Sequence, residues 1–229
     1  MPDAQAAVTS RELRIEPGCG ARGTLVSESD FRQLRHLTKN ALQQVMLQIE
    51  HAHDLKTTVR GSRLLADLQR RILLSAYISD ALFGITGSAA SMSERLRVLS
   101  ESTVRMLADG AQAIRLDVEV TGDCPEPLQQ LVLRIAHEFV ANAVKHGMRR
   151  RVAGAIRVGF YTRTDGCVAL VVSDDGWGFR TSPDAGDGLR IAGDLAASAG
   201  GTISLRRSCV TVAELELPSS RAAARLSSP

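Results

Sequence analysis

One histidine, His36, precedes an apolar helical pattern in the stretch LRHLTKNALQQV. It could be an idle surface residue, a core residue, a metal ligand or a nucleophile. The apolar stripe of this helix, at about 100° per residue, holds Leu34, Leu37, Thr38, Ala41, Val45 and Ile49. His36 points roughly the opposite way, which argues against a core position. An exposed imidazole is partly neutral at neutral pH and open to in-line attack, as phosphoryl transfer requires. An idle surface histidine is the alternative.

A second group of polar residues lies in HEFVANAVKHG, residues 137–147. Glu138, Asn142 and Lys145 are spaced at i, i+4 and i+7 and therefore share one helix face. A carboxylate, a carboxamide and an ammonium suit a hydrated magnesium ion beside phosphates, because Mg²⁺ takes oxygen ligands and lysine neutralises phosphate charge. A solvated polar face of an amphipathic helix is the alternative.

Two glycine motifs follow in the second half of the chain. In VVSDDGWGF an apolar strand leads into D-x-G-x-G, formed by Asp174, Gly176 and Gly178. Glycine allows a sharp turn and close approach to a ligand, and the carboxylate can accept a hydrogen bond from an exocyclic amine. Further on, Gly186 and Gly188 open a helix whose N-terminal amides could hold phosphate oxygens. A plain Asp-Gly turn and a flexible helix entry are the alternatives.

The first half of the chain has helical periodicity. Residues 1–26 show no period and predict a loose lead-in. Spacings of three and four predict a helix over residues 28–54, and Gly61 with Ser62 indicates a break. A second apolar helix is predicted through Leu64, Leu68, Ile72 and on to Phe83. Such a hairpin needs a partner surface, so we expect a homodimer with a four-helix bundle.

A third helix and a change of period follow. Ser91 and Glu94 form a capping box that opens a helix ending near Asp109-Gly110. The elements predicted after it are a strand over 114–120, a helix over 125–146, strands over 156–160 and 168–172 joined at Asp165-Gly166, a helix over 189–198, and strands over 202–205 and 210–217. This order predicts a mixed sheet covered on one side by helices, an α/β sandwich.

Composition excludes several classes of protein. The formal net charge is +3 and aromatic residues are 3% of the 229 residues, which argues against nucleic-acid and membrane partners. The four cysteines are scattered and predict reduced thiols, not a zinc site or a disulfide framework. No apolar run is long enough for a membrane span or a signal peptide, so we expect a cytoplasmic protein.

The order of the motifs in the second half resembles the Bergerat ATP-binding fold, also called GHKL, of histidine kinases, gyrase and MutL. E-x-x-x-N-A-x-K-H-G on a helix, D-x-G-x-G after a strand and G-x-G-L before a helix carry this resemblance. It implies ATP and Mg²⁺ as cofactors, with Asn142 binding the metal and Asp174 holding the adenine amine. It implies further nucleotide-binding roles for Lys145, Gly176, Gly178, Gly186, Gly188 and Leu189.

A second resemblance joins the two halves. HLTKNALQQV is similar to the H-R-x-K-N-N-L-Q phosphoacceptor box of the HWE-like histidine kinases, and implies catalytic roles for His36, Lys39 and Asn40. The N-box of that superfamily resembles HEFVANAVKHG and implies Glu138 as a base or orienter. The implied division is a loose segment 1–26, a helical dimerisation and phosphotransfer domain 27–110, an ATP-binding domain 111–218 and a disordered tail 219–229. No sensor domain is implied.

Three functions fit this division. The first is a two-component histidine kinase that autophosphorylates His36 from ATP and passes the phosphoryl group to a response-regulator aspartate, with input from a separate sensor protein. The second is a histidine phosphotransferase with a degenerate ATP domain that relays phosphoryl groups between receiver domains. The segment between Gly178 and Gly186, which corresponds to the lid over ATP in this fold, is short, and a short lid favours the phosphotransferase. The third is a serine kinase of the anti-sigma-factor type, which has no need of a helical hairpin.

Overall fold

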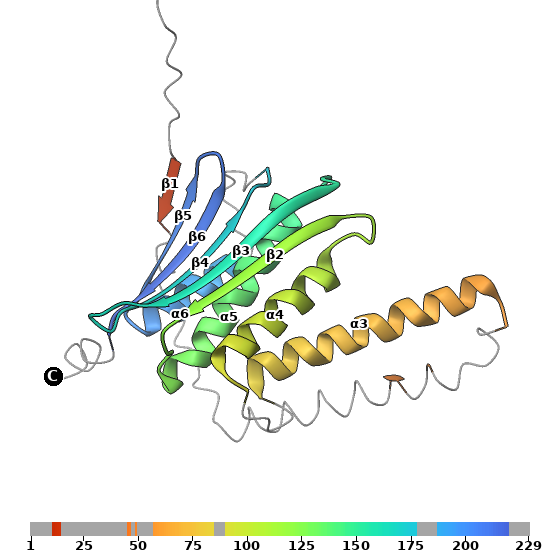
Figure 1. Ribbon diagram of the computed structural model, residues 1–229, viewed down its shortest axis with the longest axis horizontal. Coiled ribbons are helices and arrows are strands. Elements are labelled where there is room, and N and C mark those ends of the chain that lie inside the picture. The colour runs from red at the N-terminus through yellow and green to blue at the C-terminus, as the bar shows by residue number, and fades with distance from the viewer. Residues whose placement is uncertain are drawn as a thin grey trace, which may run out of the picture.

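A computed structural model of the chain describes residues 11–14, 45–46, 49, 57–84, 90–177 and 187–219. In this part six strands form one sheet in the order β1-β5-β6-β4-β3-β2 (Figure 1). The elements in chain order are β1 Arg11–Arg14, α3 Val59–Phe83, α4 Met92–Leu107, β2 Ala113–Thr121, α5 Glu126–Asn142, η1 Ala143–Gly147, β3 Ala153–Thr162, β4 Val168–Asp174, α6 Asp187–Ser198, β5 Thr202–Arg207 and β6 Thr211–Leu217.

The sheet is mixed, and helices cover one of its faces (Figure 1). Strands β2 and β3 are parallel and are joined through α5, whereas the other neighbouring pairs are antiparallel. Helices α4, α5 and α6 pack on the covered face, and the described core is one continuous cluster between the two layers. The predicted α/β sandwich is confirmed.

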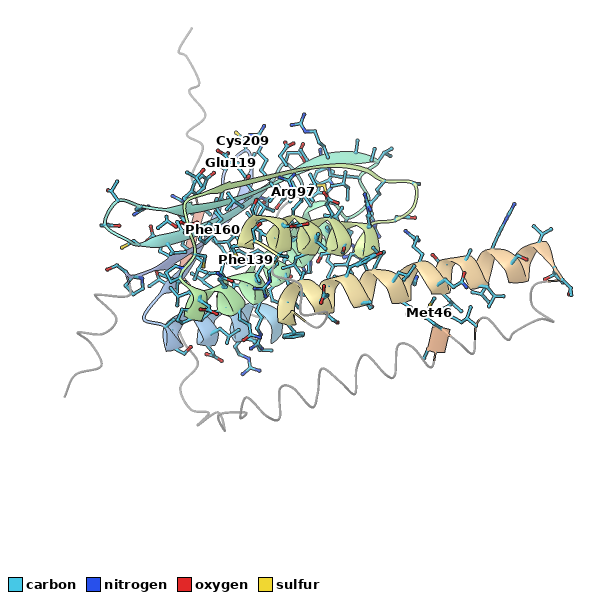
Figure 2. The ribbon with its side chains drawn as sticks, turned by 60° about the horizontal axis from the view of Figure 1, so that its bottom comes forward. Met46, Arg97, Glu119, Phe139, Phe160 and Cys209 are labelled. Carbon is cyan, nitrogen blue, oxygen red and sulfur yellow. The ribbon has the colours of Figure 1, made fainter. Side chains whose placement is uncertain are left out.

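Strand periodicity decides which side chains enter the core. Along β4, Val168, Leu170, Val172 and Asp174 are all buried, because alternate residues of a strand face the same side. Figure 2 shows Phe139 of α5 and Phe160 of β3 between the helices and the sheet, and both are almost fully buried. The same alternation that fills the core therefore directs the last residue of β4 toward the helices.

Helix α3 begins earlier than the sequence indicates. The Thr58 side chain accepts a hydrogen bond from the Gly61 N–H at 3.0 Å and caps the helix. The predicted break at Gly61 and Ser62 is wrong, because both residues lie in the first turn of a 25-residue helix. The helix ends at Gly84, whose φ of 61° is left-handed.

The end of α3 is fixed to the body of the protein by Arg95 of α4. Its Nε donates to the Ala81 carbonyl at 3.0 Å, and its guanidinium also donates to the Leu82 carbonyl and to the Gln129 side chain of α5, each at 3.2 Å. Carbonyls in the last turn of a helix lack intrahelical donors, so a cation is favoured there. One guanidinium thus joins three helices.

Helix α4 packs against α3 on one side and against α5 and β2 on the other. The core runs without interruption from Ile78 of α3 through Leu96 and Leu99 of α4 to Leu133 of α5. The predicted domain boundary at residues 110 and 111 therefore does not fall at a gap in the packing.

The N-terminal half of α3 leaves apolar side chains exposed, and it extends beyond the sheet (Figure 1). Leu64 is 52% and Leu68 is 39% exposed, although both belong to the predicted apolar stripe. Leu65 is buried instead. Of the predicted helix over residues 28–54, the structure describes three residues, all helical, in which Ile49 is buried and Val45 is 43% exposed.

The loose lead-in expected over residues 1–26 is wrong for four residues. Arg11–Arg14 form the edge strand β1, which pairs with β5. Strand pairing is a long-range event that a four-residue charged segment does not reveal. The expected tail begins at Ser219, and residues 220–229 lie outside the described residues.

Two further sequence predictions concern the cysteines and membrane-spanning helices. Cys124, Cys167 and Cys209 are free thiols, and Cys19 lies outside the described residues. None of the helices in the described part of the chain is both long and apolar enough to cross a membrane.

Candidate functional site

Asp174 ends β4 and faces the helical layer. Its side chain is buried, and its Oδ1 accepts a hydrogen bond from the Gly176 N–H at 3.0 Å. Burial raises the pKa of Asp174 to about 6; Asp175 adds to the rise, while the Gly176 hydrogen bond, Arg151 and Arg207 oppose it. A buried carboxylate with a single short-range donor keeps acceptor capacity for a ligand.

Two glycines allow the end of η1, the turn that continues α5, to pack directly on Asp174. A Cβ on Gly147 would overlap the Asp174 carboxylate, and a Cβ on Gly176 would overlap the Gly147 carbonyl. The Trp177 N–H donates to that same carbonyl at 3.0 Å. Gly176 thus packs closely on the backbone of Gly147, whereas its predicted close approach to a ligand stays a prediction.

The last turn of the predicted helix over 125–146 is a π-helix, η1. The Met148 N–H donates to the Ala143 carbonyl at 2.9 Å, which is an i to i+5 bond. The Gln112 side chain donates to the Met148 and Arg151 carbonyls at 2.7 and 2.8 Å and holds the following loop. π-Turns within helices are frequent at functional sites.

A cavity lies between these elements. Its lining consists of Phe139, Asn142, Ala143, His146, Gly147, Val172, Asp174, Leu189, Leu205, Thr211 and Ala213. Two polar atoms in this lining, Asn142 Nδ2 and Thr211 Oγ1, are buried without a hydrogen-bond partner. Buried polar atoms nearly always have partners, so two orphans beside a buried carboxyl point to a polar ligand.

The start of α6 borders the same region. A Cβ on Gly188 would overlap a carboxylate oxygen of Glu138, so the first turn of α6 lies directly against α5. Leu189 is half-buried and lines the cavity. The N-terminal amides of α6 can attract phosphate oxygens at this position. Lys145 is exposed on η1 and does not line the cavity.

His137, which precedes Glu138, is held against α4. Its Nδ1 lies 3.0 Å from Thr103 Oγ1, and that hydroxyl donates its proton to the Leu99 carbonyl at 2.7 Å. With its hydrogen directed to the Leu99 carbonyl, the hydroxyl accepts from Nδ1 of His137. Burial lowers the pKa of His137, whereas Glu138 opposes this shift and Lys145 adds to it, so the neutral form of the ring is favoured.

Arg151 braces the turn after β4. Its guanidinium donates to the Asp175 carbonyl at 2.6 Å, and the Asp175 carboxylate accepts from the Ala155 N–H at 2.9 Å. Arg149 and Arg150 are exposed. Arg151 is therefore a structural residue of the site.

The structure brings Asn142, Asp174 and Leu189 to one cavity and places Gly176 and Gly188 at its border. His36, Lys39, Asn40, Gly178 and Gly186 lie outside the described residues. Sequence reasoning missed Thr211, which belongs to no motif, and Gly147, whose only signal was its place at the end of HEFVANAVKHG.

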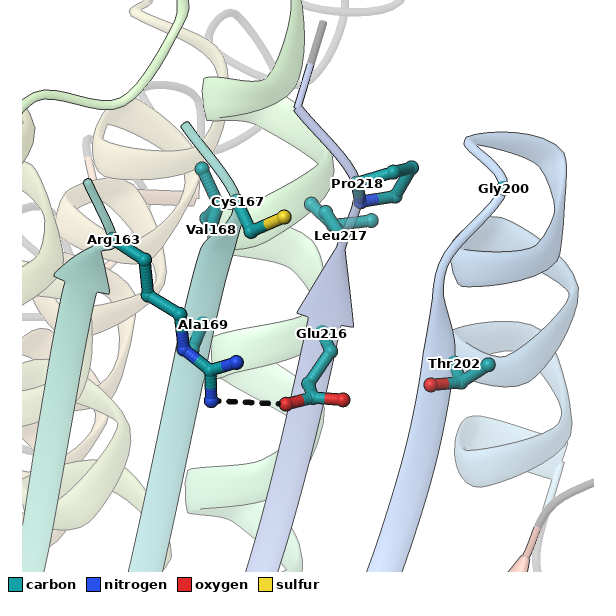
Figure 3. A pocket seen from close by; sticks show the side chains of 9 residues that line it. All are labelled: Arg163, Cys167, Val168, Ala169, Gly200, Thr202, Glu216, Leu217 and Pro218. Atoms are coloured by element: carbon teal, nitrogen blue, oxygen red, sulfur yellow. Dashed lines mark hydrogen bonds and ion pairs between the residues drawn. The ribbon is translucent and has the colours of Figure 1, made fainter. Parts of the chain in front are cut away.

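Another cavity lies at the far end of the sheet (Figure 3) and is lined by Arg163, Cys167, Val168, Ala169, Gly200, Thr202, Glu216, Leu217 and Pro218. The positively charged side chain in this lining, Arg163, is already paired within the protein, because it forms an ion pair with Glu216 at 3.1 Å. Among the described residues, no group of three or more His, Cys, Asp or Glu side chains could hold a metal. A metal ion at the first cavity would thus need oxygen atoms of a bound molecule, such as a phosphate, in addition to Asn142.

Comparison with known proteins agrees with this architecture. No protein-family model matches the chain, and no curated protein matches it. Among solved structures, the histidine kinase domain of the Erythrobacter litoralis EL346 blue-light activated histidine kinase is 19% identical, with a TM-score of 0.56 over 86% of this chain and 95% of that one. The longer structure of that kinase is 17% identical, with a TM-score of 0.55 over 87% of this chain and 63% of that one. The predicted resemblance to histidine kinases is thereby confirmed for the fold.

Proposed function

We propose that this chain is an ATP-dependent protein-histidine kinase. The observation that carries the proposal is the cavity in which the Asp174 carboxylate, the Thr211 hydroxyl and the Asn142 amide converge, two of them with unused hydrogen-bonding atoms. The fold shared with histidine kinase domains supports it. These groups match an adenine nucleotide, whose exocyclic amine can donate to the carboxylate and whose nitrogen and oxygen acceptors can receive hydrogen bonds from the amide and the hydroxyl.

Each residue has a proposed task in nucleotide binding. Asp174 accepts a hydrogen bond from the adenine amine, and Thr211 supplies a hydroxyl beside it. Asn142, whose Nδ2 has no hydrogen-bond partner within the protein, could donate from that nitrogen to a ligand oxygen and would hold Mg²⁺ through Oδ1. Mg²⁺, when bound, neutralises phosphate charge. The first turn of α6 around Gly188 and the exposed Lys145 attract the phosphates.

The proposed reaction transfers the γ-phosphoryl group to His36. The Nε2 atom forms a bond to phosphorus while the bond from phosphorus to the bridging oxygen breaks and ADP leaves. The imidazole proton is released to a base, a task that we assign to Glu138, whose carboxylate lies against the start of α6. Lys39 and Asn40 are proposed to position the acceptor and the phosphate. A response-regulator aspartate would then receive the phosphoryl group.

The test is incubation of the purified protein with γ-labelled ATP and Mg²⁺ beside a His36→Ala variant. Acid-labile, base-stable label on the wild type and not on the variant is expected. Equal label on both proteins would refute His36 as the acceptor. Absence of label together with absence of ADP binding by calorimetry would refute the kinase.

A histidine phosphotransferase without nucleotide use is the second candidate, favoured by the few residues between Gly178 and Gly186. In that case a phosphorylated receiver domain would label His36 in the absence of ATP. The anti-sigma-type serine kinase ranks third, because it gives no task to the 25-residue helix α3.

A homodimer through α3 is part of the proposal. Of the exposed apolar side chains of α3, Leu64 and Leu68 lie one turn apart on one face, whereas Val59, Leu73 and Tyr77 lie on the opposite side of the helix. Burying the face of Leu64 and Leu68 against a second copy would remove apolar surface from water, in the manner of a four-helix bundle. Sedimentation analysis of Leu64→Glu/Leu68→Glu should give a monomer where the wild type gives a dimer. An unchanged mass would exclude this face. Input from a separate sensor protein is also proposed.

A further inference from the structure

Strand β1 lies at the edge of the sheet, far in sequence from its partner (Figure 1). Arg11, Glu12, Leu13 and Arg14 pair antiparallel with Arg207, Arg206, Leu205 and Ser204 of β5. Without β1, strand β5 would be the edge and would leave a row of backbone donors and acceptors unpaired. Residues 11–14 thus complete the sheet on the side of β5.

The candidate nucleotide cavity lies on two rows of residues that run across the sheet from β1. The first row is Arg11, Arg207, Thr211 and Asp174, and the second is Leu13, Leu205, Ala213 and Val172. Every member of these rows on β6 and β4, together with Leu205 of β5, lines the cavity. On the sheet side the cavity lining therefore ends at Leu205 of β5, and β1 is the next strand outward.

Edge strands open more readily than strands with two neighbours, because fewer backbone hydrogen bonds hold them. Strand β5 contributes Leu205 to the cavity wall and pairs through Arg207 with Thr211. Pairing with β1 gives β5 a second neighbour at both of these rows. Loss of β1 would leave this wall held by β6 and by packing against α6.

We propose that Arg11–Arg14 is a positioning strand for the nucleotide site: its docking on β5 holds the β5–β6 wall, and nucleotide binding in turn favours docking. This inference rests on the proposed function. The coupling is reciprocal, since two equilibria linked through one structure change each other by the same factor. The strand precedes His36 in the chain, so an event acting on the N-terminal segment would change nucleotide affinity.

The first test is a double substitution, Glu12→Pro/Leu13→Pro, in the full chain. Successive strand residues direct their N–H groups to opposite sides, so one of the two prolines removes a donor toward β5 in either register. The control is Ala6→Pro/Ala7→Pro, placed before the strand. We expect the dissociation constant for ADP to rise roughly fivefold or more in the first variant and to stay within about twofold of wild type in the control.

Hydrogen exchange gives the reciprocal reading on the same proteins. ADP should slow exchange of residues 11–14 in the wild type, and the strand substitutions should speed exchange of residues 202–207. If the wild type binds ADP and both proline variants bind it equally, the inference alone is overturned. If the wild type does not bind ADP, the proposed function falls with it.

A cross-link separates pairing within one chain from pairing between two copies. Glu12 and Arg206 are direct partners, and cross-strand partners are close enough for a disulfide. In a Cys209→Ser background, Glu12→Cys/Arg206→Cys should oxidise to a monomer on a non-reducing gel and retain wild-type ADP affinity. A disulfide-linked dimer, or a locked monomer with weakened ADP binding, would overturn the proposal.

Discussion

Thr211 provides a test in which stability and ligand affinity change in opposite directions. It begins β6, is 8% exposed, and its hydroxyl is buried in the candidate cavity without a hydrogen-bond partner. Thr211→Val keeps the shape of the side chain and replaces the hydroxyl by a methyl group. Valine also suits a strand, so the backbone has no reason to move.

The size of both effects follows from the environment of the hydroxyl. A buried hydroxyl without a partner costs about 1–3 kcal/mol, so its removal should raise the free energy of unfolding of the nucleotide-free protein by about 1 kcal/mol. A neutral hydrogen bond to a ligand is worth about 0.5–1.5 kcal/mol. Its loss corresponds to an ADP dissociation constant roughly 2 to 13 times larger.

Urea unfolding without nucleotide and calorimetric titration with ADP and Mg²⁺ measure the two quantities. Thr202→Val is the matched control, because Thr202 is exposed on the neighbouring strand β5 and should change neither. A Thr211→Val protein that is less stable than wild type and binds ADP equally well would refute the reasoning. That result would mean that the hydroxyl is bonded within the protein.

Three other substitutions test other parts of the site and fold. Asp174→Asn should weaken ADP binding at pH 7.5 by roughly tenfold or more, since a charge-assisted hydrogen bond is worth about 1.5–3 kcal/mol. Because the pKa of Asp174 is raised to about 6, its protonated form favours folding, and the stability of the wild type relative to this variant should fall from pH 4 to pH 6 in denaturant titrations. Gly188→Ala should displace the Glu138 carboxylate of α5 and slow the labelling of His36 by ATP tenfold or more, while the protein stays folded. Gly110→Ala is the control: a Cβ at Gly110 meets no neighbouring atom, so neither the labelling rate nor the folding should change. Arg95→Met should lower the free energy of unfolding in urea by about 2 kcal/mol, whereas Arg97→Met, exposed on the same helix, should change it by less than about 0.5 kcal/mol.

Local signals predicted the elements of the fold well. The N-cap bond of the predicted capping box is present, with the Glu94 N–H donating to Ser91 Oγ at 3.2 Å. The Asp165-Gly166 turn also forms, with Gly166 at a φ of 81° and the Asp165 carboxylate accepting from the Cys167 N–H. Each of these features depends on residues within a few positions of one another, so the sequence pattern contains the necessary information.

The errors have different physical origins. Gly61 by its residue type predicts a break, but its N–H donates to the Thr58 side chain in the first turn, where glycine disturbs few helical hydrogen bonds. The burial of Leu65 in place of Leu64 depends on how α3 meets its neighbours, which periodicity alone does not fix. Thr211 lies in the site because the register of β6 with β4 places it opposite Asp174, and strand register is not visible in a local sequence pattern.

The sequence predicted which motif residues belong to the candidate site, but it did not predict how these residues are arranged in space. Asn142 and Asp174 line one cavity as the motif order suggested, whereas Lys145, predicted on the same helix face as Asn142, lies outside its lining. The π-turn of η1 explains the difference, because it changes the angular spacing after residue 142. A face calculated for a regular α-helix does not hold through such a turn.

The pairing of β1 with β5 also has a consequence for the order in which the protein is made. Arg11–Arg14 leave the ribosome before their partners on β5, which follow roughly 190 residues later. At about 5–20 residues per second, the strand waits on the order of 10–40 s before its pairing surface exists. Such non-local pairing requires the closure of a long loop and forms slowly. Although β1 precedes the other described strands in the chain, it can therefore join the sheet only after β5 has been made.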